Sequence, residues 1–153
     1  MSETDRRAIR VLMVTSPYYT QISEELEAGA LAALNAAGAV VERVEVPGAL
    51  EIPTAIAMAE EAGGGYDGYV ALGCVIRGET THYEIVSNES ARGLMTLGVA
   101  DGLAIGNGVL TVEDEGQALR RAKRDELNKG GGAAEACLSM IALRRRFEGE
   151  ADA

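Results

Sequence analysis

Residues 69–76 read YVALGCVI, a nearly continuous apolar run. A strand in a parallel sheet shows this pattern because helices bury both of its faces. The run therefore predicts a central parallel strand. Outward from it, residues 9–15 (IRVLMVT) and 103–110 (LAIGNGVL) are also apolar and predict two further strands. Residues 40–46 (VVERVEV) alternate apolar and charged side chains, which is typical of a strand near a sheet edge.

Segments with helical spacing separate these strands. We expect helices near residues 21–38, 53–61, 82–97, 114–124 and 129–147. Gly38 is suited to end the first of them, Pro53 lies in the first turn of the second, and Asn128 is a favourable N-cap for the last. The order β-α-β-α-β-α-β-α-α requires right-handed crossovers and predicts a parallel, doubly wound α/β sheet.

Length and composition favour a single globular unit. The chain has 153 residues, of which 47% are hydrophobic and 25% charged. We expect one domain over residues 1–153, with an ordered core at about 9–147. With 14 basic and 24 acidic residues the net charge is −10, which argues against binding to nucleic acid or an anionic membrane.

The remaining composition predicts a cytoplasmic protein without a metal site. No apolar run reaches membrane-span length, and residues 1–10 lack the apolar segment of a signal peptide. Cys74 and Cys137 lie far apart and form no CxxC motif, and the chain has one histidine. A Cys/His metal centre is therefore not expected, and free thiols fit a reducing compartment.

Three polar segments directly follow predicted strands and should meet at one edge of the sheet. They are residues 16–19 (SPYY), 47–51 (PGALE) and 77–82 (RGETTH). Ligands of open α/β sheets bind at this edge. Gly78 allows close backbone approach to a ligand, and the free N–H groups at the following helix start favour an anion such as phosphate. His82 is a candidate for proton transfer, with a capping or surface histidine as the alternative.

Other features of the sequence allow two interpretations each. The basic residues at 120, 121, 123 and 124 form either a solvated helix face or a phosphate clamp. Tyr18 and Tyr19 either pack in the core or stack on a planar ligand. The chain contains no Gly-x-Gly-x-x-Gly after its first strand, no P-loop and no Gly-x-Ser-x-Gly motif, so dinucleotide, nucleotide and serine-hydrolase sites are not indicated.

Four segments resemble the lumazine synthase family. They are residues 46–53 (VPGALEIP), 73–84 (GCVIRGETTHYE), 108–111 (GVLT) and 128–130 (NKG). The similarity to the family extends from about residue 10 to residue 147. The resemblance implies a flavodoxin-like three-layer α/β sandwich, with a four-stranded parallel sheet in the order 2-1-3-4. It also implies a riboflavin-pathway enzyme without cofactor or metal. Such an enzyme condenses 5-amino-6-ribitylaminouracil with 3,4-dihydroxy-2-butanone 4-phosphate to 6,7-dimethyl-8-ribityllumazine, phosphate and water.

The resemblance also implies roles for residues of one chain. The aromatic that stacks on the pyrimidine is Tyr18, and the proton-transfer residue is His82. The residues implied to contact the ribityl chain are Ala49, Leu50 and Glu51. The ring would be lined by Val75 and Ile76, and the phosphate would be bound by Glu79 and Thr80.

Further roles fall to an adjacent subunit, because the family's pockets lie between the subunits of a pentamer. Arg121 would clamp the phosphate, Lys129 would approach the uracil carbonyl, and Asn107 would reach into the neighbour's pocket. Residues 122–127 (AKRDEL) lack the pattern associated with sixty-subunit shells, so we expect a homopentamer or a pair of pentamers.

Three positions depart from the family pattern and motivate an alternative. Many members carry Phe at the positions of Asn107 and Leu50, and an acidic residue at the position of Gly132, where the nearest acid here is Glu135. The alternative hypothesis is a non-catalytic paralogue that binds riboflavin or lumazine. A flavodoxin-like protein holding a phosphorylated flavin is a third hypothesis, and it rests on fold class alone.

Overall fold

The computed structural model describes residues 7–149 and contains a four-stranded sheet with helices on both sides. Its elements in chain order are β1 (Arg10–Thr15), α1 (Thr20–Ala36), β2 (Val40–Glu45), the 3-10 turn η2 (Ala49–Glu51), α2 (Ile52–Glu61), β3 (Gly68–Ile76), α3 (His82–Asp101), β4 (Ile105–Val112), α4 (Glu115–Ala122) and α5 (Lys129–Phe147). Among these residues, no helix is both long and apolar enough to cross a membrane.

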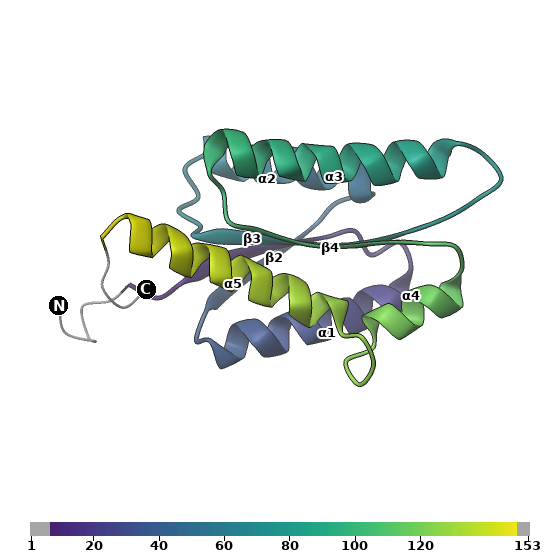
Figure 1. The fold of residues 1–153 in the computed structure, drawn as a ribbon, viewed down its shortest axis with the longest axis horizontal. Coiled ribbons are helices and arrows are strands. Elements are labelled where there is room, and N and C mark those ends of the chain that lie inside the picture. Colours follow the sequence, from purple (N-terminus) through teal and green to yellow (C-terminus); the bar gives the residue numbers. More distant parts are fainter. Residues whose placement is uncertain (1–6, 150–153) are drawn as a thin grey trace.

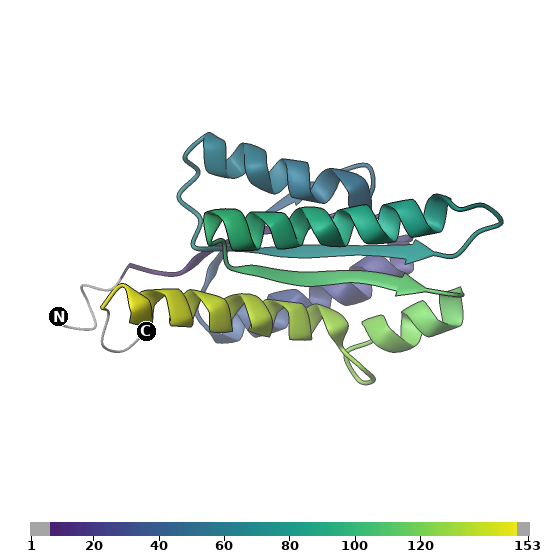
Figure 2. The ribbon, with the colours of Figure 1, turned by 45° about the horizontal axis from the view of Figure 1, so that its top comes forward.

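The sheet confirms the predicted topology. All neighbouring strands run parallel, in the order β2-β1-β3-β4. Figures 1 and 2 show α2 and α3 over one face of the sheet and α1, α4 and α5 over the other. The protein is therefore a three-layer, flavodoxin-like α/β sandwich. β3 is an interior strand, and β2 is an edge strand, as their contrasting apolar patterns predict.

Alternating residues of the interior strands fill two separate cores. Val11 and Met13 of β1 point into the core beneath α1 and α5, together with Val70 and Leu72 of β3. Their sequence neighbours, including Leu12, Val14, Tyr69 and Ala71, point into the core beneath α2 and α3. This alternation explains why both faces of β1 and β3 had to be apolar.

Several predicted bounds were wrong by a few residues. α3 continues to Asp101 instead of ending near 97, because the left-handed residue that stops it is Gly102, at φ 63°. Residues 103 and 104 then lead back to the sheet, so β4 covers Ile105–Val112 rather than 103–110. α1 and α4 end at Ala36 and Ala122, two residues earlier than expected.

Two glycines let α5 pack directly on its neighbours. A Cβ atom at Gly106 of β4 would lie 1.8 Å from the carbonyl oxygen of Ala133 in α5. A Cβ at Gly130 would lie 2.0 Å from the carbonyl oxygen of Leu26 in α1. Backbone atoms leave no room at these positions, so the seating of α5 depends on glycine at both.

A polar network ties β1, α1 and the edge strand together just below the carboxyl end of the sheet. Glu27 accepts hydrogen bonds from Ser23 Oγ at 3.0 Å and from Thr15 Oγ1 at 3.4 Å, and both hydroxyl residues are buried. Arg43 of β2 forms an ion pair with the same carboxylate, which raises the pKa of the guanidinium. The network fixes the start of α1 and hence the segment that leads into it.

The Glu27→Ala variant should therefore be less stable. It removes the acceptor shared by the two buried hydroxyls, and we expect a loss of about 1–3 kcal/mol in the free energy of unfolding, measured in urea. Glu24→Ala, at an exposed position of the same helix, is the matched control and should change stability by less than about 0.5 kcal/mol. Equal effects of the two substitutions would contradict this role for the network.

Candidate active site

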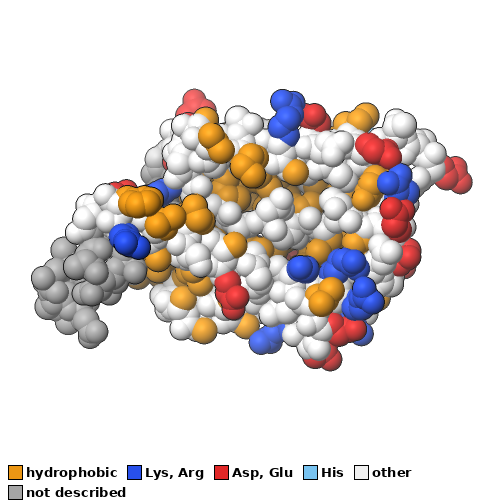
Figure 3. Space-filling model, in the orientation of Figure 1, with side chains coloured by type: hydrophobic (Ala, Val, Ile, Leu, Met, Phe, Trp, Pro, Cys, Tyr) orange, Lys and Arg blue, Asp and Glu red, His pale blue; other side chains and the backbone are white. Residues whose placement is uncertain are grey.

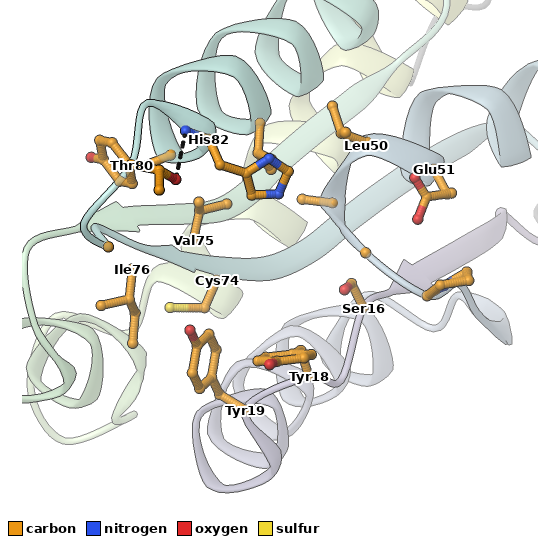
Figure 4. Close-up of a pocket in the computed structure, with 16 residues that line it drawn as sticks. Ser16, Tyr18, Tyr19, Leu50, Glu51, Cys74, Val75, Ile76, Thr80 and His82 are labelled. Atoms are coloured by element: carbon orange, nitrogen blue, oxygen red, sulfur yellow. Dashed lines mark hydrogen bonds between the residues drawn. The ribbon is translucent and has the colours of Figure 1, made fainter.

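A cavity of about 510 Å³ opens at the carboxyl ends of the strands, where the three polar segments meet. Its walls come from the segment after β1, from η2 and the turn before it, from the end of β3, and from the first turn of α3 (Figure 4). The lining residues are Ser16, Tyr18, Tyr19, Pro47, Gly48, Ala49, Leu50, Glu51, Cys74, Val75, Ile76, Gly78, Thr80, His82, Tyr83 and Val86. The predicted convergence of the three loops is thus confirmed.

Two tyrosines form the wall contributed by the β1–α1 segment. Ser16 anchors that segment, since its backbone N–H donates to the Leu72 carbonyl at 2.9 Å. The Tyr18 ring is 76% exposed and stands edge-on to Tyr19, with 4.9 Å between ring centroids and 79° between planes. Tyr19 is half-buried, and burial is the main cause that raises the pKa of its hydroxyl. Tyr19 therefore serves as a fixed support, while Tyr18 presents an open ring face.

The opposite wall is the loop of residues 77–81, which runs into α3. Thr80 Oγ1 accepts a hydrogen bond from the His82 backbone N–H at 3.3 Å (Figure 4). Within the described chain, the backbone N–H groups of residues 78–81 have no hydrogen-bond partner. Unpaired N–H groups at the start of a 20-residue helix provide a favourable place for an anion.

The His82 side chain points into the cavity between the end of β3 and η2 (Figure 4). It is exposed to solvent, with Val75 on one side of it and Leu50 on the other. An imidazole in this place can exchange protons with a ligand in the cavity. This position favours the proton-transfer interpretation over a capping histidine, because the imidazole points into the cavity and the start of α3 has no side-chain cap.

The η2 turn carries the third set of predicted residues. Ala49 is buried, whereas Leu50 and Glu51 are exposed at the cavity. Glu51 lies at the N-cap position of α2, and Pro53 lies in the first turn, where its missing N–H costs no hydrogen bond. The turn thus holds a carboxylate at the cavity wall through the start of a helix.

Four predicted site residues do not line this cavity in the single chain. Glu79 is exposed in the 77–81 loop, and Asn107 is exposed on β4, where its Oδ1 accepts from the Val109 N–H at 2.9 Å. Arg121 lies on α4 and donates to the Gln117 carbonyl at 3.1 Å, and Lys129 is the first residue of α5. No Lys or Arg is among the lining residues, so one described chain brings no cationic side chain into the cavity.

The cavity also includes residues that the sequence reasoning did not assign. Tyr83 directly follows His82, and Val86 lies one helical turn after His82. Helical spacing from His82 could therefore have predicted that both residues line the cavity. Cys74 lines the cavity from β3. Burial, followed by the charge of Glu115, raises the pKa of the Cys74 thiol to about 11. The thiol therefore stays protonated at neutral pH and is not a nucleophile.

The fold and this cavity define a doubly wound α/β protein with a ligand site beyond the carboxyl ends of its strands. The described residues include no group of three or more His, Cys, Asp or Glu side chains suited to hold a metal ion. A family model described as 6,7-dimethyl-8-ribityllumazine synthase matches residues 8–145. The chain belongs to the 6,7-dimethyl-8-ribityllumazine synthase family.

Similar proteins from several bacteria cover almost the whole chain. A 6,7-dimethyl-8-ribityllumazine synthase of Bartonella tribocorum is 58% identical over 147 residues, which are 96% of this chain and 97% of that protein. One from Methylorubrum populi is 60% identical over 140 residues, with 89% and 83% covered. One from Bartonella henselae is 58% identical over 142 residues, with 92% of each chain covered.

Proposed function

We propose that the protein condenses 5-amino-6-ribitylaminouracil with 3,4-dihydroxy-2-butanone 4-phosphate to form 6,7-dimethyl-8-ribityllumazine, phosphate and water. The observation that carries this proposal is the convergence of an open aromatic ring, a carboxylate and an imidazole on one cavity, beside a loop with unpaired backbone N–H groups. Membership of the family supplies the reaction. The substrates are small molecules, and no cofactor, metal or nucleic acid takes part.

The cavity suits each part of the two substrates. The pyrimidine stacks on Tyr18, with Val75 and Ile76 along its edge, and the ribityl chain extends toward Ala49, Leu50 and Glu51. The phosphate lies at the start of α3, where Glu79 and Thr80 belong to the loop with free N–H groups. Imine formation, phosphate elimination and ring closure mostly require positioning and proton transfer, and His82 supplies the latter.

The proposed enzyme is a homo-oligomer, a pentamer or a pair of pentamers, with each site shared by two subunits. A phosphorylated substrate requires positive countercharge, and no Lys or Arg of residues 7–149 lines the cavity of one chain. Lys and Arg side chains gather over α4 and the start of α5 (Figure 3), which carry Arg121 and Lys129. Apolar side chains are exposed along α3 and α5, including Val99 at 77% and Phe147 at 79%. These surfaces support subunit contacts that bring Arg121, Lys129 and Asn107 to a neighbour's cavity.

We further propose that the chain acts as a single domain in the cytoplasm. Its two cysteines are free thiols, which persist in a reducing compartment. Localisation of the tagged protein by cell fractionation tests this assignment.

The test of the function is direct. Purified protein is mixed with both substrates, and lumazine formation is followed by absorbance and fluorescence. Formation well above the uncatalysed rate supports the enzyme. A background rate combined with tight riboflavin binding would instead identify a binding paralogue.

Arg121→Ala should raise the KM for the phosphorylated substrate by about 10- to 100-fold, because a charged hydrogen bond to phosphate contributes about 1.5–3 kcal/mol. The KM for the pyrimidine should change little. Arg92→Ala removes an exposed arginine that pairs with Glu89 within α3, and it should leave both constants unchanged. Equal KM values for the phosphorylated substrate in wild type and Arg121→Ala would exclude Arg121 as the clamp.

A further inference from the structure

Arg77 is the first residue after β3, and its side chain contacts two different elements. Its Nη1 lies 2.9 Å from Glu84 Oε1 in α3, and its Nε lies 2.8 Å from Glu113 Oε2, directly after β4. Its guanidinium carbon lies 4.6 Å from the ring centroid of Tyr83, also in α3. The backbone N–H of Arg77 donates to the Val112 carbonyl at 2.9 Å, so the residue is held at both its main chain and its side chain.

These contacts span the loop that carries the anion-binding N–H groups and leads to His82. Arg77 is at one end of residues 77–81, and Tyr83 and Glu84 lie just beyond the other end. The loop has no side-chain cap at the start of α3. Its internal side-chain bond is the one between Thr80 and His82. The Arg77 cluster is therefore what connects the two ends of this loop to each other and to β4.

The charges of this cluster argue against Arg77 as a phosphate ligand. One guanidinium faces two carboxylates, so the group of three carries a net negative charge, and Arg77 does not line the cavity. Its donors are directed at Glu84 and Glu113, and both contacts raise the pKa of the guanidinium. The planar Arg77 guanidinium bonds two carboxylates and lies over the Tyr83 ring at the same time, so it holds these three groups in a fixed arrangement. A lysine ammonium cannot make all three contacts in this geometry.

We propose that Arg77 is a positioning residue: by joining Glu84, Tyr83 and Glu113 it fixes the 77–81 loop, and with it the anion-binding N–H groups and the His82 imidazole. The proposal rests on the proposed function for its kinetic consequence only. Arg77→Met should lower kcat by about 10- to 100-fold, because small displacements of reacting groups carry penalties of this size. The KM for the phosphorylated substrate should rise, whereas the KM for the pyrimidine should stay the same, since Tyr18 and Glu51 lie on other loops.

The single histidine of the chain offers a readout that does not depend on turnover. The imidazole C–H signals in a proton NMR spectrum belong to His82, and inorganic phosphate is the probe for the neighbouring N–H groups. In Arg77→Met we expect shifted or broadened His82 signals and a weaker response to phosphate. Arg77→Lys should restore part of both. The melting temperature should change by no more than about 3 °C, because the ion pairs are exposed.

Two further variants complete the experiment. Arg92→Met removes an arginine of α3 that bonds one acid and spans no loop, and it should match wild type in kinetics and His82 signals. Glu113→Gln keeps an acceptor for Arg77 but removes one negative charge. If Arg77 acted by attracting phosphate, Glu113→Gln would lower the KM of the phosphorylated substrate, and that result would overturn the proposal. Wild-type kinetics and His82 signals in Arg77→Met would also overturn it. If the wild-type protein is inactive but the His82 signals still differ between wild type and Arg77→Met, the proposed function is refuted and the positioning role stands.

Discussion

The His82→Ala variant is expected to keep its fold and to lose most of its condensation activity. The imidazole is exposed in the cavity, so its removal creates no void in the core. Proton transfer by a positioned side chain contributes about 10²- to 10⁴-fold to a rate, and the described residues that line the cavity include no second imidazole. We expect kcat for lumazine formation to fall by about that factor.

The supporting variants separate proton transfer from simple shape. His82→Gln keeps a hydrogen-bonding side chain but cannot carry a proton at neutral pH, so it should be as slow as His82→Ala. Ser87→Ala, on the same helix and outside the cavity, should behave like wild type, since Ser87 Oγ has no partner in the described chain. Free imidazole added to His82→Ala should restore part of the rate. A rate within about threefold of wild type in His82→Gln would show that proton transfer is not the role of this residue.

The Gly106→Ala variant should lose about 3 kcal/mol or more of its free energy of unfolding. The added Cβ would lie 1.8 Å from the Ala133 carbonyl oxygen and 2.7 Å from its carbonyl carbon. These are backbone atoms within α5, so no side-chain rotation relieves the overlap, and the whole helix must move off the sheet. Overpacking of this kind exceeds the usual range for core substitutions.

Thermal unfolding measures this effect. For a domain of this length, about 1 kcal/mol corresponds to roughly 2–4 °C, so the melting temperature should fall by about 6 °C or more. Gly98→Ala is the matched control, because its Cβ would meet the nearest neighbour, the Leu103 carbonyl, at 3.8 Å in ordinary contact. That variant should be slightly more stable than wild type, as alanine is the better helix former. A Gly106→Ala protein that melts with wild type would mean that α5 is not seated by this contact.

Strong local patterns made most of the fold predictable. The apolar run at 69–76 predicted an interior parallel strand, and the alternation of apolar and charged residues at 40–46 predicted an edge strand. The sheet order confirms both predictions. The bounds of α3 and β4 were missed because Val99 is apolar but exposed, so helical periodicity fades before the helix ends. The helix ends at Gly102, and the sequence alone does not distinguish this left-handed glycine from Gly98, which is helical four positions earlier.

The part of the candidate site that lies in segments after strands was predictable from the sequence. Tyr18, Glu51, Thr80 and His82 lie within six residues after a strand and line one cavity. Asn107 and Lys129 have no such local signal, and their assignment to a ligand depends on the family resemblance. For Arg121 the basic run at 120–124 indicated either a solvated helix face or a phosphate clamp, and the resemblance favours the clamp. The Arg77 cluster is not predictable from the sequence, because Glu113 is 36 positions away in the chain and meets Arg77 only through the pairing of β3 with β4.

Gly132 lies in the second half of the first turn of α5, and in the described chain a Cβ there would meet nothing within 4 Å. Its neighbours at 130 and 131 are buried, but this position faces outward. The missing acidic residue is therefore not excluded by packing. Every glycine codon is one base away from a codon for Asp or Glu, so a single mutation can introduce an acid, and with Glu the helix would gain about 0.5 kcal/mol in stability from losing a glycine. This part of the protein is open to evolutionary change in a way that Gly106 and Gly130 are not.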